Sequence, residues 1–217
     1  MKVEMGESLV ISWLKHAKKC QIVQGNWKVS MKTWNLENEE MITEIIRFFS
    51  EYYLENNNFQ LFKSTTSVKQ IIKQGEIDVL GVSIHSKQIE NLYAIDVAFH
   101  EGGLNYTNRG GTEANILKKL VRMICTVIGY FDVKNADVIF ATPKMSETKY
   151  SALESEIENL QDLINSKWDL DFNVRLIANK GFKEEIFDVV SNLASDVADT
   201  SELYMRAIQM YNLMNKN

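Results

Sequence analysis

Residues 75–101 constrain the fold most, because two β-branched runs flank a short polar turn there, a pattern that predicts a β-hairpin. Alternation divides the second run between two faces, with Tyr93, Ile95, Val97 and Phe99 on one and Ala94, Asp96, Ala98 and His100 on the other. An acid in an otherwise apolar strand is costly to bury unless it has a partner or a metal ion. Asp78, near the start of the first run, is the residue that we expect to meet Asp96 across the hairpin.

The composition predicts a globular protein with a single domain. Of the 217 residues, 45% are hydrophobic and 24% are charged, which suffices for one sizeable core. No apolar run approaches the roughly 18 residues of a membrane span, and the first residues resemble no signal peptide. Cys20 and Cys125 form neither a disulfide framework nor a metal knuckle. We therefore expect a cytoplasmic protein without a membrane partner.

The remaining elements follow from hydrophobic periodicity. Helices are expected over 7–19, 37–55, 65–73, 113–129, 146–166 and from 181 to about 213 with a break near 199–201. Extended segments are expected over 20–30, 137–142 and 172–178. Thr112 is the expected cap of the helix that follows it. This order predicts an α/β (α+β) sandwich, in which a central mixed β-sheet is flanked by helices.

A local basic stretch contrasts with the formal net charge of −5. Between Ser8 and Leu36 there is no acid, and the stretch contains Lys15, His16, Lys18, Lys19, Lys28 and Lys32 interleaved with Trp13, Trp27 and Trp34. Lysines with aromatic residues can hold phosphates and stack bases. The alternative is a helix with a solvated lysine face and tryptophans in the core.

A second candidate for phosphate binding is the segment Arg109-Gly110-Gly111-Thr112, which lies ahead of a predicted helix. Backbone N–H groups at a helix N-terminus can cradle a phosphate. The spacing fits neither the Walker nor the dinucleotide fingerprint, so an ordinary loop and helix cap is the alternative. The candidate nucleic-acid contacts are therefore Lys15, Lys18, Lys19, Lys28 and Arg109.

The order of elements and the position of the acids resemble the PD-(D/E)xK nuclease superfamily, which has the restriction-endonuclease-like fold. The family places an Asp at the start of its second strand and an acid-x-Lys triplet on its third. Here Gly75-Glu76-Ile77-Asp78-Val79-Leu80-Gly81 resembles the first signature, and Asp96-Val97-Ala98 lies where the triplet belongs. Glu7 matches the extra acid that many members carry on the first helix.

The resemblance covers about residues 5–145, with a helical insertion at about 31–70, and leaves 146–217 as a C-terminal helix-strand-helix extension. It implies that Asp78, Asp96 and Glu7 hold Mg²⁺ or Mn²⁺, since hard cations favour oxygen ligands. Such an ion can polarise a phosphodiester and activate water. Each acid also has a purely structural alternative. Asp78 can be a carboxylate at the start of a strand, Asp96 one inside a strand and Glu7 one in the first turn of a helix.

Ala98 departs from the family pattern, because the triplet lysine that activates water and steadies charge on the phosphate is missing. Lys118, Lys119 and Arg122 on the following helix are candidate replacements. His100 is another, either as a cation or as a metal ligand or base, unless it is a structural histidine.

Three functional hypotheses remain. The first is metal-dependent hydrolysis of DNA or RNA. The second is a catalytically degenerate nuclease fold that binds nucleic acid or a partner protein without cleaving. The third is an unrelated interaction protein whose helices at 37–55 and 146–166 form a homodimer or partner surface.

Overall fold

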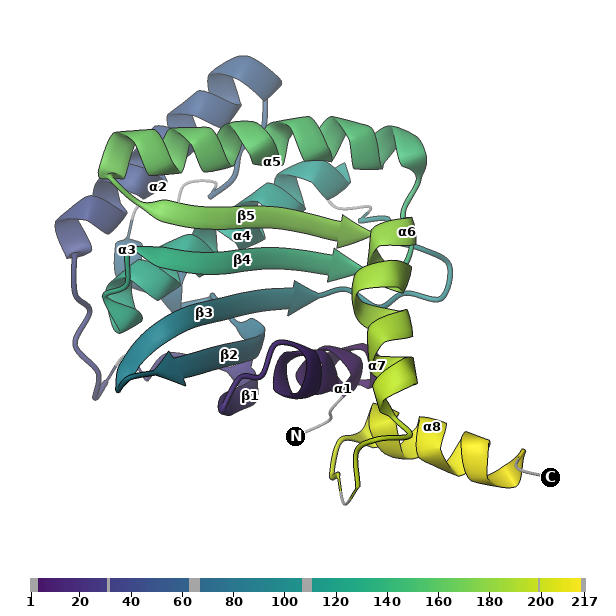
Figure 1. Ribbon diagram of the computed structural model, residues 1–217. Coiled ribbons are helices and arrows are strands. Elements are labelled where there is room, and N and C mark those ends of the chain that lie inside the picture. The colour runs from purple at the N-terminus through teal and green to yellow at the C-terminus, as the bar shows by residue number, and fades with distance from the viewer. Residues whose placement is uncertain (1–3, 31, 63–66, 107–110, 199, 216–217) are drawn as a thin grey trace.

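The computed structural model describes residues 4–30, 32–62, 67–106, 111–198 and 200–215. Within these residues, five strands form one mixed sheet in the order β1-β2-β3-β4-β5 (Figure 1). The strands are β1 (Ile22–Trp27), β2 (Ile77–His85), β3 (Gln88–Val97), β4 (Asn135–Thr142) and β5 (Asp171–Ala178). β2 runs antiparallel to both β1 and β3, whereas β4 runs parallel to β3 and β5 parallel to β4.

The helices follow the predicted order along the chain. They are α1 (Met5–Ser12), the π-helical η1 (Trp13–Ala17), α2 (Glu39–Asn57), α3 (Val68–Lys73), α4 (Gly111–Phe131), α5 (Glu147–Trp168), α6 (Asn179–Gly181), the π-helical η2 (Phe182–Phe187), α7 (Asp188–Leu193) and α8 (Leu203–Met214). Two boundaries differ from expectation. α4 begins at Gly111, so Thr112 lies inside its first turn, and the helix expected from 181 to the break near 199–201 consists of η2 and α7 and already ends at Leu193, before α8 begins at Leu203.

Helices flank the sheet on both faces and enclose two separate hydrophobic cores (Figure 1). α2, α3, α4 and α5 pack on one face, and α1, η1, η2, α7 and α8 pack on the other. Ala94 and Ala98 of the predicted hairpin belong to the first core, and Tyr93 and Ile95 belong to the second. The predicted alternation of the second hairpin strand is therefore confirmed.

The hairpin between β2 and β3 turns at Ser86 and Lys87. Both residues have positive φ angles, 50° and 67°, as a two-residue type I′ turn requires. The right-handed twist of such a turn matches that of the strands it joins, which fixes the pairing register. The register in turn decides which side chains of β2 and β3 stand opposite one another.

Candidate functional site

Two neighbouring strands align acidic side chains in one row across the sheet. The β2–β3 register pairs Val79 with Ile95, so Asp78 lies opposite Asp96 one residue further along. On β1, Gly25 pairs with Val79 and Trp27 with Ile77, and Asn26 between them has a left-handed backbone. Opposite residues of antiparallel strands have their Cβ atoms about 4.5–5.5 Å apart. The hairpin therefore brings together the two acids that the sequence singles out.

Asp96 is buried, with only 4% of its surface exposed, and it has a cationic partner. Lys119 Nζ on α4 lies 2.7 Å from Asp96 Oδ1. Burial raises the pKa of the Asp96 carboxyl, and the Lys119 ammonium opposes that shift. Burial acts to lower the pKa of Lys119, but the charge and the hydrogen bond of Asp96, with smaller contributions from Tyr106 and Asp78, together outweigh it and the net shift is upward. Lys119 is therefore held in its cationic form.

No ion pair joins Asp78 to a cation among the described residues, and Val97 N donates a hydrogen bond of 2.7 Å to Asp78 Oδ2. Burial raises the pKa of Asp78 to about 7, and the charge of Asp96 adds to the shift. The Val97 N–H and Lys119 oppose it, whereas Glu7 contributes a further small rise. Two carboxylates thus share a poorly solvated place, and their mutual repulsion is only partly relieved by Lys119.

Glu7 reaches the edge of this row from α1 on the other side of the sheet. Asn26 Nδ2 donates to Glu7 Oε2 at 2.9 Å, and Asn26 adopts a left-handed backbone with φ of 52°. Gly6 permits the close approach of α1, because a Cβ at this position would lie 3.0 Å from Cβ of Phe99. The negative charge of Glu7 raises the pKa of Asp78, but it is the smallest of the contributions to that shift.

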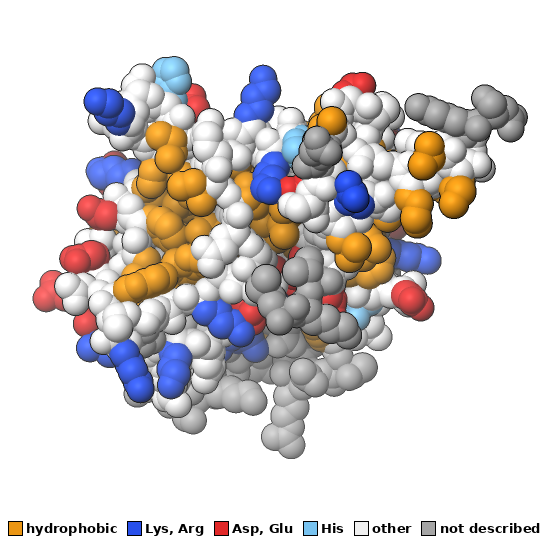
Figure 2. All heavy atoms as spheres, turned by 90° about the horizontal axis from the view of Figure 1, so that it is seen from below, with side chains coloured by type: hydrophobic (Ala, Val, Ile, Leu, Met, Phe, Trp, Pro, Cys, Tyr) orange, Lys and Arg blue, Asp and Glu red, His pale blue; other side chains and the backbone are white. Residues whose placement is uncertain are grey.

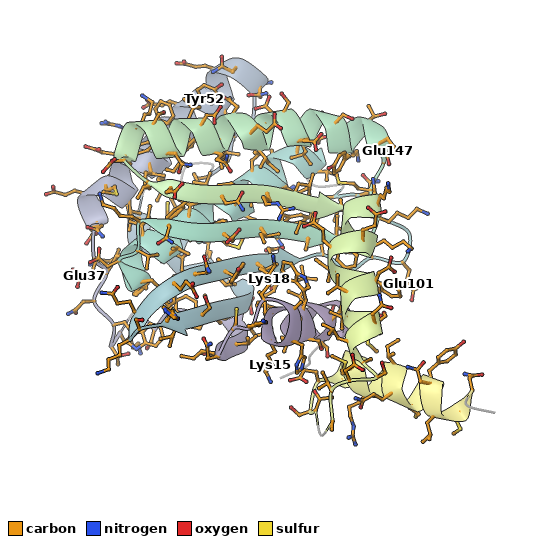
Figure 3. All side chains as sticks on the ribbon, viewed as in Figure 1. Lys15, Lys18, Glu37, Tyr52, Glu101 and Glu147 are labelled. Atoms are coloured by element: carbon orange, nitrogen blue, oxygen red, sulfur yellow. The ribbon has the colours of Figure 1, made fainter. Side chains whose placement is uncertain are left out.

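Tyr106 completes the surroundings of Lys119. The charge of Lys119 acts on its phenol, and its backbone N–H donates to Thr112 Oγ1 at 3.1 Å. Burial raises the pKa of the Tyr106 phenol. His100 is exposed, and its ring lies edge-on to Tyr106 with centroids 6.2 Å apart. His100 therefore borders the site, and Figure 3 places its neighbour Glu101 at the same end of the sheet, beside α6 and α7.

The two candidate lysines of α4 have different partners. Lys119 contacts Asp96, whereas Lys118 Nζ donates at 2.9 Å to Asn115 Oδ1 on its own helix. Arg122, one turn beyond Lys119, donates at 2.8 Å to Gln74 Oε1. Of these three cations, Lys119 is the one that the structure brings to the carboxylates.

The basic stretch near the N-terminus lies apart from the carboxylates for most of its length. Lys15 pairs with Glu202, and His16 Nε2 lies 3.4 Å from the other carboxylate oxygen. Burial would raise the pKa of Glu202, but the hydrogen bonds from Lys15 and His16 outweigh it and hold the pKa below its usual value. Figure 3 shows Lys15 and Lys18 extending from the same helical segment. Lys18 lies over the Trp13 ring at 4.9 Å.

The other predicted nucleic-acid contacts are distributed as follows. Lys28 Nζ lies 2.9 Å from Glu76 Oε1, whose charge also reaches Asp96. Lys19 is exposed, and Arg109 lies outside the described residues. Trp13 and Trp27 are buried, and the partly exposed Trp34 packs on Trp27 with ring centroids 5.7 Å apart. Trp13 and Trp27 are therefore core residues, as the second interpretation of this stretch predicts, whereas Trp34 is 45% exposed.

Sequence reasoning missed Asn26, Glu76 and Tyr106 as neighbours of the site. Glu76 stands two residues before Asp78, within the quoted motif, and could have been found there. Asn26 and Tyr106 carry no spacing signal, because a left-handed residue and a loop bring them to the site. Their positions depend on tertiary contacts that periodicity does not encode.

The donor set of the row fits a hard divalent cation held by two carboxylates. Among the described residues, no three His, Cys, Asp or Glu side chains gather closely enough to hold a metal ion. Zn²⁺ sites need three or four such ligands. Mg²⁺, however, is commonly bound through one or two carboxylates and keeps several waters. The repulsion between Asp78 and Asp96 is the kind of strain that such an ion relieves.

Comparison of the chain with protein families, with curated proteins and with solved structures finds no match. Within the described residues, none of the helices combines the length and the hydropathy of a membrane span.

Proposed function

We propose that this protein is a metal-dependent nuclease that hydrolyses phosphodiester bonds in DNA or RNA, with Asp78, Asp96 and Lys119 at its centre. The observation that carries the proposal is the cation at 2.7 Å from Asp96, in a row where two carboxylates stand opposite each other. Two acids and a lysine from separate segments are the set that metal-assisted phosphodiester chemistry needs.

The order of elements supports assignment to the restriction-endonuclease-like fold. α1 is followed by the antiparallel strands β1, β2 and β3, then by α4 and the parallel strand β4. α2 and α3 lie between β1 and β2 in the chain, where the resemblance requires an insertion. The fold and the polar row are independent features that agree with the same family.

Lys119 takes the role that the family gives to the triplet lysine. Ala98 is buried in the core beside α4, and Thr142 Oγ1 donates to its carbonyl at 2.8 Å. The family's lysine lies on the strand, whereas Lys119 extends from α4, the helix that packs over that strand. The ammonium of Lys119 stays charged and is held at 2.7 Å from Asp96, so it can stabilise negative charge that develops on a phosphate.

Asp78 and Asp96 are the residues that would hold the ion, with Glu7 further out at the edge of the row. A bound Mg²⁺ or Mn²⁺ would supply Lewis acidity toward the phosphate and a more acidic water. The hydrogen bond from Asn26 holds Glu7, and the ion pair with Asp96 holds Lys119, so these side chains are positioned before a substrate binds.

Substitution of the two adjacent lysines tests the proposal. Lys119→Gln keeps a hydrogen-bond donor toward Asp96 but removes the charge, so we expect cleavage in Mn²⁺ to fall on the order of 10²–10³-fold. Lys118→Gln is the matched control and should cleave at nearly the wild-type rate. Cleavage of labelled single-stranded, duplex and branched substrates is measured. Equal activity of wild type and Lys119→Gln, or no cleavage by wild type, would refute the proposal.

A catalytically degenerate protein that only binds nucleic acid is the second candidate. It is favoured by the direct Lys119–Asp96 ion pair, which occupies one carboxylate oxygen of the row. Calorimetric titration with Mn²⁺ separates the two. A binding heat that wild type shows and Asp78→Asn does not supports the nuclease. If wild type shows no binding heat but still binds nucleic acid in a salt-sensitive way, the degenerate protein is supported.

A further inference from the structure

Helix α8 carries apolar side chains on two opposite faces. One face packs on the body of the protein, where Tyr204 and Met205 are buried. The backbone N–H of Tyr204 donates to Ser8 Oγ at 2.9 Å, and Gln209 Nε2 donates to the Val197 carbonyl at 2.6 Å. These contacts anchor α8 against α1 and against the segment that follows α7.

The opposite face is apolar but exposed. Its large side chains are between 52% and 79% exposed, and they are Leu203, Met210, Tyr211, Leu213 and Met214. Leu203, Ala207, Met210 and Met214 form a central stripe with spacings of 4, 3 and 4 residues. Figure 2 shows hydrophobic side chains in orange on the arm that α8 forms at the right of the molecule. We call this surface the outer stripe.

A surface helix of a globular protein normally has one apolar stripe, turned toward the core. α8 already satisfies that requirement through Tyr204 and Met205. An apolar face of this size on an anchored helix is typical of a protein–protein contact. We therefore expect the outer stripe to bind a partner that has a matching apolar surface.

We propose that the occupant is a second copy of this chain, with α8 packed antiparallel on α8 about a two-fold axis. A two-fold contact uses the same surface twice, so it requires self-complementarity. The spacing of 4, 3 and 4 residues is the same in both directions, which pairs Leu203 with Met214 and the small Ala207 with the large Met210 of the other copy. A shallow hollow of about 520 Å³ beside Ala207 and Met210 offers room for such a side chain.

Area and charge agree with this pairing. Taking about 150 Å², the lower end of the aromatic range, for a fully exposed large side chain, the outer stripe and its flanks expose roughly 500 Å² per copy, or about 1,000 Å² for two, which is the lower limit for a specific interface. Arg206 is the one charged residue of α8 between Leu203 and Met214. A pair of identical helices therefore brings no row of like charges together.

The mass of the protein in solution tests the proposal. Light scattering on the wild-type chain at tens of micromolar should give twice the 25.0 kDa of one chain. Met210→Asp should give a single-chain mass with an unchanged circular dichroism spectrum. Leu54→Asp, at a half-exposed leucine on α2, is the control and should remain a dimer. A monomeric wild type, or a dimer that survives Met210→Asp, would overturn the proposal.

Cysteine cross-linking tests the antiparallel register. Ala207→Cys and Met210→Cys chains are mixed and mildly oxidised, and the products are separated by mass. The native Cys20 and Cys125 are buried, and burial raises the pKa of Cys20 to about 11, so both stay unreactive. The mixed disulfide should dominate over either self-linked product. Predominance of self-linked chains would contradict the antiparallel arrangement.

Discussion

At the scale of single residues, the proposed chemistry depends on the electrostatic repulsion between the carboxylates of Asp78 and Asp96. Asp96 has Lys119 at 2.7 Å, but the nearest polar contact of Asp78 is a backbone N–H. Burial and the neighbouring charge raise the pKa of Asp78 to about 7 from its ordinary value of 3.8. An acid that is less acidic in the folded state costs stability whenever it must ionise. Proteins accept such a cost at functional sites more often than elsewhere.

This cost gives a prediction for the pH dependence of stability. Below the unfolded pKa near 4, Asp78 is protonated in both states and costs nothing. Between about pH 4 and pH 7 the unfolded state ionises Asp78 while the folded state keeps it protonated, so wild-type stability falls as pH rises and levels off above the folded pKa of about 7. In EDTA, Asp78→Asn should be more stable than wild type by roughly 2–4 kcal/mol at pH 8, with little difference at pH 4. Urea unfolding at several pH values measures this, and a pH-independent gap would disagree with the raised pKa.

At the scale of elements, the contact of α1 with the end of β3 sets the outer edge of the site. Gly6 makes this contact possible, because an added Cβ would lie 3.0 Å from Cβ of Phe99 and 3.2 Å from Cγ1 of Val97. Glu7, the next residue, receives the hydrogen bond of Asn26. The backbone of α1 must therefore stay close to β3 for Glu7 to reach the row.

We expect Gly6→Val to displace the start of α1. Overpacking of this kind costs about 1–3 kcal/mol of stability. Movement of Glu7 should also lower Mn²⁺-dependent cleavage several-fold. Gly102→Val is the control, since nothing lies within 4 Å of a Cβ there, and it should match wild type in both assays. Thermal unfolding and cleavage rates are compared, and a fully active, fully stable Gly6→Val would show that the contact is unimportant.

Much of the element order was predictable because each element buries one face, and burial leaves a period in the sequence. The alternation through Asp96 predicted its face, and the turn chemistry predicted the hairpin. The choice between Lys118 and Lys119 was not predictable, since adjacent helix residues differ by 100° and the rotation of α4 is set by tertiary packing. Tyr106 and Asn26 were not predicted as neighbours of the site for a related reason, because a loop and a residue with a left-handed backbone leave no periodic pattern in the sequence.

At the scale of the whole molecule, the charge opposes binding of a polyanion. The formal net charge is −5, and Lys15 and Lys28 are each paired with an acid. The repulsion between the carboxylate row and a phosphate would be lowered by a divalent ion. Nucleic-acid binding should therefore depend on the metal more than on the surface lysines.

This dependence can be measured with Lys119→Gln, which keeps both carboxylates but should cleave slowly. We expect its affinity for labelled DNA to be at least about tenfold higher in Mg²⁺ than in EDTA, and to weaken with salt. The double variant Asp78→Asn/Lys119→Gln should show no response to Mg²⁺. Fluorescence anisotropy measures both proteins, and equal affinities in Mg²⁺ and EDTA for Lys119→Gln would count against a metal-bridged substrate.

The most direct measurement is a crystal of the wild-type protein soaked in Mn²⁺, with the ion located by its anomalous scattering. The proposed function predicts a peak about 2.2 Å from a carboxylate oxygen of Asp78 and from one of Asp96, with Lys119 beside it. A crystal in which this position stays empty at millimolar Mn²⁺, or in which the ion binds elsewhere, would contradict it.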